Sequence, residues 1–149
     1  MSLDGNNTSH AFATTSANEQ DASFSPDSRF LAYVSDETGR DEIYVRPLSG
    51  EGGKTVVSTN GGRWPRWSPS GNELFYLEGT TMVSVPVTLE PSFRPGTPEP
   101  LFEGNYQGWF DVFPDGRHFA MITFAKADLR ELEVIVNWST ELEEKVPTN

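Results

Sequence analysis

The sequence predicts an all-β protein made of three β-propeller blades, each a four-stranded antiparallel sheet. A turn motif recurs three times, with its prolines at positions 26, 69 and 114 and therefore at spacings of 43 and 45 residues. Each copy is followed by two short apolar runs rich in β-branched and aromatic residues, which are typical of strands. A repeat of about 40–45 residues that holds four strands is typical of a propeller blade.

The turn motif has a clear physical basis. Its copies read FSPDSRFLAY, WSPSGNELFY and VFPDGRHFAM, over residues 24–33, 67–76 and 112–121. In a Ser-Pro-Asp-Gly segment the serine accepts a backbone hydrogen bond, the proline presets φ and the glycine closes a type I turn. Each motif therefore predicts a tight turn between two strands.

The predicted strands follow in order from the propeller axis outward. Inner strands are expected at 21–25, 63–68 and 107–113. The second strands are expected at 31–36, 74–79 and 119–124, and the third at 42–48, 82–88 and 133–138. Outer strands are expected at 54–59 and 99–104, with one more at 10–16, before the first complete blade. The proline-rich stretch 88–100 is interpreted as a stiff surface connector.

Three blades are half of a six-bladed ring. Closed rings have about four to eight blades, and an open arc would expose two large apolar faces. The other half could be missing, could be a second copy, or the ends could be adapted to an open arc. We expect a homodimer in which residues 10–16 of one chain complete the third blade of its partner, because two-fold closure is the commonest symmetry. The predicted organisation is a disordered tail at 1–9, a propeller at 10–140 and a tail at 141–149.

Composition excludes several function classes. The formal net charge is -11, which argues against binding to nucleic acids and to anionic membranes. The chain has no cysteine, so disulfides, thiol nucleophiles and thiolate zinc sites are excluded. No apolar run approaches the length of a membrane span, and the N-terminus carries no signal-peptide pattern.

The three repeats, together with SDETGRDEIYVRPL at 35–48 and GGRWPRWSPSGNELFYL at 61–77, resemble the WD40-like β-propeller repeats of the TolB type. More narrowly, they are similar to the C-terminal propeller of bacterial serine/threonine protein kinases. Ser28, Ser70 and Phe113 depart from the usual Gly, Asp and Ser of that turn. The resemblance implies a bacterial sensory module in the periplasm or elsewhere outside the cytoplasm.

Catalytic and metal-binding patterns are weak. His10 and His118 lack the neighbours of a metal site, and the acidic cluster at 36–42 lacks the spacing of a calcium loop. We expect a hairpin turn there, with no metal and no cofactor. Asp21 and Asp111 on the inner strands are the candidate carboxylates of a propeller hydrolase, whereas Asp27 and Asp115 are explained by turn chemistry.

The candidate binding site lies where the outer-to-inner connections reach the channel. Aromatic and arginine side chains on such a rim are typical of binding hot spots. Gly108 and Arg66 lie beside the six residues that we predict to bind ligand, which are Gln20, Asp21, Arg63, Trp64, Gln107 and Trp109.

Two functions follow from these observations. The first is a non-catalytic recognition or scaffold module that binds a protein, a peptide or a small ligand at the channel mouth, so that the chain is not an enzyme. The second is the accessory propeller of a prolyl-oligopeptidase-like hydrolase, or a propeller hydrolase with channel carboxylates. An α/β domain with a G-x-S-x-G motif, or a kinase domain, elsewhere in a longer protein would distinguish the two.

Overall fold

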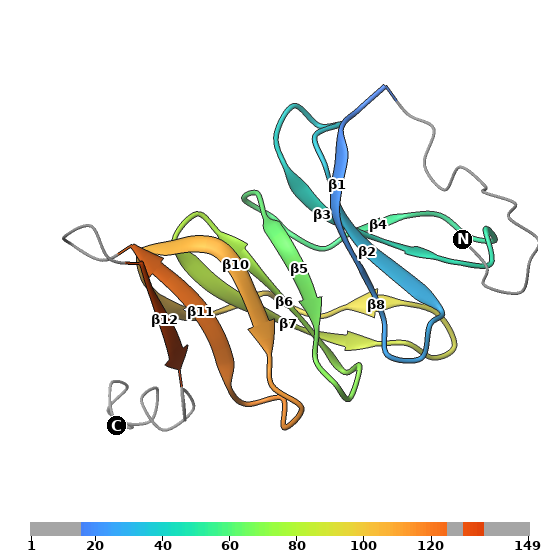
Figure 1. The fold of residues 1–149 in the computed structure, drawn as a ribbon. Helices are drawn as coiled ribbons and strands as arrows, with labels where there is room; N and C mark the ends of the chain where they lie inside the picture. The colour runs from blue at the N-terminus through green and yellow to red at the C-terminus, as the bar shows by residue number, and fades with distance from the viewer. Residues whose placement is uncertain (1–15, 125–129, 136–149) are drawn as a thin grey trace, which may run out of the picture.

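The computed structural model describes residues 16–124 and 130–135, and all of its regular elements are strands. Three antiparallel sheets follow one another along the chain and lie side by side as an arc (Figure 1). This confirms the predicted all-β, propeller-like fold. Both predicted tails and nearly all of the predicted outer strand at 10–16 lie outside the described residues. No helix in the described part of the chain is long and apolar enough to span a membrane.

The first blade is a complete four-stranded sheet. Its strands pair in chain order, as predicted, and they are β1 (Glu19–Phe24), β2 (Phe30–Ser35), β3 (Glu42–Pro47) and β4 (Thr55–Val56). The outer strand β4 is shorter than the predicted 54–59. The chain stays hydrogen-bonded to β3 just beyond β4, because Val57 donates its N–H to the Ile43 carbonyl at 2.8 Å.

The second blade has the same order of four strands, namely β5 (Arg63–Trp67), β6 (Glu73–Glu78), β7 (Thr81–Thr88) and β9 (Glu99–Glu103). In the third blade the described strands are β10 (Tyr106–Val112), β11 (Phe119–Phe124) and β12 (Arg130–Ile135). Strand β12 begins earlier than the predicted residue 133, because Arg130 already pairs with Phe124. The inner strand β5 contacts β1 on one side and β10 on the other, so the inner strands line one side of the arc.

The stretch 88–100 is more than a surface connector, which corrects the prediction. Within it β8 (Arg94–Pro95) folds back and pairs with the end of β7. The Phe93 ring packs between the first two blades, at 5.8 Å from the Phe30 ring and 6.1 Å from the Trp67 ring. The sequence pattern did not indicate this contact, because Phe93 is a single half-buried aromatic residue among prolines.

Two apolar clusters join the three blades. The cluster between the first and second blades contains buried residues of both, among them Val34, Ile43, Leu74 and Tyr76. The cluster between the second and third blades centres on the Phe119 ring, whose centroid is 4.9 Å from that of Phe75. Alternate residues of the middle strand β6 therefore face opposite neighbouring blades, which is why this strand is apolar from Leu74 to Leu77.

The three repeated turns have the same hydrogen bonds. In the first, Ser25 donates its N–H to the Phe30 carbonyl at 2.9 Å, and Ser28 donates its N–H to the Ser25 carbonyl at 2.8 Å. The residue that closes each turn is left-handed, with φ of 57° at Ser28, 74° at Gly71 and 68° at Gly116. The predicted turn geometry is therefore confirmed, and the first blade builds it without glycine.

Replacing Ser28 by glycine is expected to raise the free energy of unfolding by about 1 kcal/mol, because a left-handed conformation strains residues that carry a Cβ. Urea denaturation followed by circular dichroism measures the change. Ser70→Gly is the matched control, since Ser70 lies in the equivalent turn without a positive φ. That control should lose stability, and a loss in Ser28→Gly as well would contradict the strain at this position.

Candidate functional site

Every inner strand carries an irregularity at the same place. The pairing register shifts between Gln20 and Ser23 in β1, between Arg63 and Arg66 in β5, and between Tyr106 and Phe110 in β10. The left-handed residues Asp21 (φ 53°), Trp64 (φ 55°) and Gly108 (φ 89°) lie inside these shifts. Bulges of this kind turn side chains away from the regular pleat and are common beside functional sites. A left-handed tryptophan is rare, so the strain at Trp64 also marks this position.

The second and third bulges contact each other through Trp64 and Gly108. A Cβ built on Gly108 would lie 2.3 Å from Cη2 and Cζ2 of the Trp64 indole. Real Cβ atoms do not approach other atoms so closely. The indole therefore lies directly on the Gly108 backbone and joins β5 to β10 at the inner edge of the arc.

Arg63 is held by a carboxylate from the first blade. Its guanidinium forms an ion pair with Asp41, and its Cζ lies 5.9 Å from the centroid of the Trp64 ring. The same three residues line part of a hollow of about 330 Å³, together with Gly61 and Leu77. The hairpin between β2 and β3, the connection before β5 and the second bulge thus meet at the start of β5.

Arg66 and Trp109 form a second pair on the neighbouring inner strands. The Arg66 Cζ lies 6.0 Å from the Trp109 ring centroid, and the arginine donates to the Pro65 carbonyl at 2.8 Å. Trp109 is 63% exposed, whereas Arg66 is half-buried. None of the ion pairs among residues 16–124 involves Arg66, so its guanidinium has no carboxylate partner there. A positive charge beside an exposed indole is thus available to a ligand.

The predicted binding residues fall into two groups. Arg63, Trp64 and Trp109 belong to the cluster around the second and third bulges. Gln20 and Asp21 lie at the first bulge, and no hydrogen bond or ion pair among the described residues joins them to that cluster. Gln107 is half-buried in the third bulge. A role in ligand binding stays a prediction for all six residues.

Sequence reasoning missed Asp41, which was assigned to the hairpin turn alone. The residue that pairs with Arg63 comes from another blade, and nothing in the local pattern around Asp41 indicates that contact. The two charges meet because the first and second blades pack side by side.

In the acidic cluster at 36–42, Glu42 has structural partners. Glu42 is 4% exposed, and its carboxylate accepts hydrogen bonds from Ser58, from Arg40 and from the Gly61 N–H. The hairpin turn predicted before it is present, with Gly39 at a φ of 90°. No group of three metal-binding side chains occurs within the described residues.

The carboxylates of the two turn aspartates, Asp27 and Asp115, accept hydrogen bonds within their turns, as predicted. Burial raises the pKa of Asp27, but hydrogen bonds from Ser25 and Arg29 outweigh it and lower that pKa overall. The Arg117 N–H, and after it the His118 ring, hold the pKa of Asp115 below its usual value. Both carboxylates therefore stabilise turns.

No protein-family model and no curated protein sequence matches the chain. Solved structures do share its fold. One is a protein from Bacteroides uniformis provisionally named a 6-phosphogluconolactonase, with 16% identity and a TM-score of 0.51 over 83% of this chain and 42% of that one. Another is an acylaminoacyl peptidase from Pyrococcus horikoshii, with 18% identity and a TM-score of 0.54 over 75% of this chain and 18% of that one.

TolB from Acinetobacter baumannii also matches, with 17% identity and a TM-score of 0.41 over 80% of this chain and 41% of that one. At identities this low, the first two structures show a similar fold and nothing more. The chain spans about two fifths of the first protein and under a fifth of the second.

These matches correct one prediction. The sequence led us to exclude an enzyme, yet two of the matching structures carry the names of a lactonase and a peptidase. The exclusion is therefore wrong, because a fold of this kind also occurs in proteins named as enzymes. It rested on the absence of local catalytic motifs, and residues from separate blades can assemble a site that no local motif reveals.

Proposed function

We propose that this chain is the recognition part of a larger β-propeller and that it binds an acidic segment of a protein or peptide. The site is the cluster around the second and third bulges, which consists of Arg63, Trp64, Arg66 and Trp109. One observation carries the proposal: the Arg66 guanidinium lies beside the exposed Trp109 indole and lacks a carboxylate partner among the described residues.

The chemistry of the cluster suits such a ligand. A guanidinium offers a planar set of donors to a carboxylate, and an exposed indole offers a flat apolar surface beside it. Tryptophan and arginine are the residues that most often dominate binding energy at interfaces. The chain as a whole carries a net charge of -11, so an acidic partner needs a local positive site such as this one.

Substituting Trp109 by alanine or Arg66 by glutamine is expected to weaken binding of glutamate-rich peptides by roughly tenfold or more. Isothermal titration calorimetry with a panel of acidic, neutral and basic peptides measures this. Phe113→Ala is the matched control, because Phe113 is an exposed aromatic residue that follows the last residue of β10 and lies outside the cluster. Equal affinity in the wild type, Trp109→Ala and Arg66→Gln would contradict the proposed site.

The predicted place of the chain in a bacterial sensory protein outside the cytoplasm belongs to this proposal. What supports it is the resemblance of the three repeats to kinase-associated propellers. The partial coverage of the matching structures agrees with a chain that works together with further blades or domains.

A second candidate is a part of a hydrolase, which the names of the two matching structures favour. Asp21 is half-buried in the first bulge, and Asp111 is exposed on β10. If these carboxylates act in hydrolysis, Asp21→Asn and Asp111→Asn should each lower lactone or ester turnover. Turnover that is insensitive to both changes would eliminate them as catalytic residues.

A further inference from the structure

The blade interfaces inside the chain define two kinds of sheet face. We call the side of a blade that meets the blade before it the leading face, and the opposite side the trailing face. In the second blade, Leu74 and Tyr76 lie on the leading face and contact the first blade, whereas Phe75 and Leu77 lie on the trailing face and contact the third. Each interface therefore joins one trailing face to one leading face.

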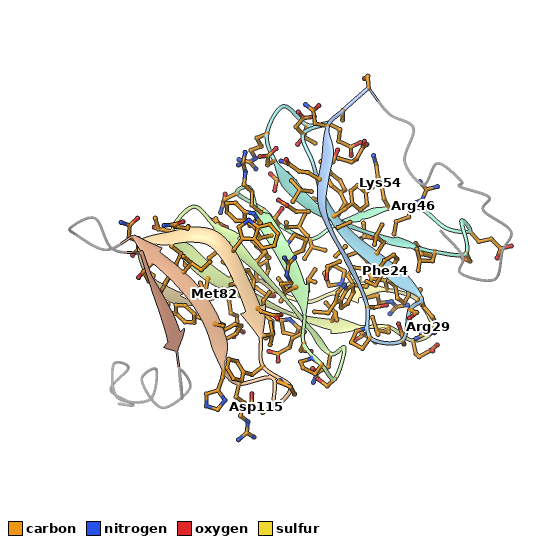
Figure 2. The ribbon with its side chains drawn as sticks, viewed as in Figure 1. Phe24, Arg29, Arg46, Lys54, Met82 and Asp115 are labelled. Atoms are coloured by element: carbon orange, nitrogen blue, oxygen red, sulfur yellow. The ribbon has the colours of Figure 1, made fainter. Side chains whose placement is uncertain are left out.

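The leading face of the first blade has no described blade to cover it, and its apolar residues are exposed only toward its edges, because Leu31 and Tyr33 on the middle strand are 9% and 5% exposed. Phe24 pairs with Leu31 just as Trp67 pairs with Leu74, so Phe24 and Trp67 hold the same position. Trp67 is 7% exposed against the first blade, whereas Phe24 is 64% exposed. Figure 2 shows Phe24, Arg46 and Lys54 on the side of the first blade that points away from the second.

A hollow on the same blade extends this surface toward the outer strand. It has a volume of about 660 Å³, and Tyr44, Lys54 and Val56 are among the residues that line it. Val56 is 50% exposed, and the Lys54 Nζ lies 5.3 Å from the Tyr44 ring centroid. The exposed part of this surface thus combines Phe24 and Val56 with a cation, as protein interfaces do, whereas the Tyr44 ring is only 4% exposed.

The opposite end of the arc carries a trailing face of the matching kind. On β11, Ala120 and Ile122 hold the positions of Phe75 and Leu77 and are half-buried. The strand register places Val134 opposite Ala120 and Leu132 opposite Ile122. These positions are apolar in sequence, like those that form the interface between the second and third blades.

We propose that the leading face of the first blade docks against the trailing face of the third blade of a second copy, so that two chains close one six-bladed ring. This proposal is independent of what the channel mouth binds. In a dimer related by a two-fold axis, the leading face of each chain would pack against the trailing face of the other, so the same interface forms twice. Six blades lie within the range of about four to eight that closed propellers use.

The test is the solution mass of the full chain, measured by light scattering across a dilution series. A dimer of twice 16.6 kDa is expected. Phe24→Arg should weaken the dimer by at least about thirtyfold, as loss of an interface hot spot does. Phe113→Arg is the matched control, because Phe113 is also exposed but lies in the turn between β10 and β11, outside the strands that form the two proposed faces, and it should remain dimeric.

Phe24→Ala is a milder variant that should also weaken the dimer, with a wild-type circular dichroism spectrum confirming the fold. A monomer at every concentration would overturn the proposal and would assign the leading face to further blades of a longer chain. A mass that grows steadily with concentration would overturn it too, because it indicates open stacking of arcs.

Discussion

Gly108→Ala is expected to lower the free energy of unfolding by about 3 kcal/mol, from overpacking and left-handed strain together. The added Cβ would lie 2.3 Å from the Trp64 ring, so the indole or the β10 backbone must move. The φ of 89° adds strain of its own, because the left-handed region is unfavourable for alanine. Urea denaturation followed by circular dichroism measures the loss.

Gly39→Ala separates these two causes. Gly39 has a φ of 90°, and a Cβ built there meets nothing within 4 Å. This variant should lose only the strain energy of about 1 kcal/mol. Equal losses in both variants would contradict the close packing of Trp64 on Gly108.

Phe119→Ala is expected to cost about 3–5 kcal/mol, the usual range for removing a buried phenylalanine. Phe119 has no exposed surface, and its ring contacts Phe75 at 4.9 Å, Phe102 at 5.8 Å and Phe110 at 6.2 Å between ring centroids. These partners belong to both the second and the third blade, so the cavity would weaken the interface that holds the third blade.

Phe113→Ala is the control for that loss, since Phe113 is 39% exposed and should cost under about 1 kcal/mol. Denaturant midpoints and slopes of both variants give the comparison. A cost below about 1 kcal/mol for Phe119→Ala would contradict its role as the centre of the second apolar cluster.

The fold could be predicted because its signals are local. Each turn motif specifies its own geometry, and the strand on either side of it pairs with its neighbour in the sequence. The early start of β12 and the short β4 were missed, because the ends of strands depend on pairing partners more than on composition. Phe93 was missed because the residues around it resemble an exposed loop, and its partial burial depends on how the first two blades pack together.

The site could be predicted only in part. Trp64 and Trp109 were visible as aromatic residues in an inner-strand segment, and the repeat placed them near the channel. The Arg63–Asp41 ion pair and the contact between Trp64 and Gly108 join different blades. They depend on how adjacent sheets pack, which no spacing within one repeat specifies. The exclusion of enzymes failed for the same reason.

The most direct test of the proposed binding site is the indole N–H region of a ¹⁵N–¹H correlation spectrum during titration with glutamate-rich peptides. The chain has four tryptophans, so each variant that lacks one assigns its signal. We expect the Trp109 and Trp64 signals to shift during the titration, and their two titration curves to give the same dissociation constant. The Trp67 signal should stay in place, because that indole is buried and donates to the Ser23 carbonyl at 3.1 Å. Unchanged Trp109 and Trp64 signals at saturating peptide would contradict a ligand site at the inner-strand bulges.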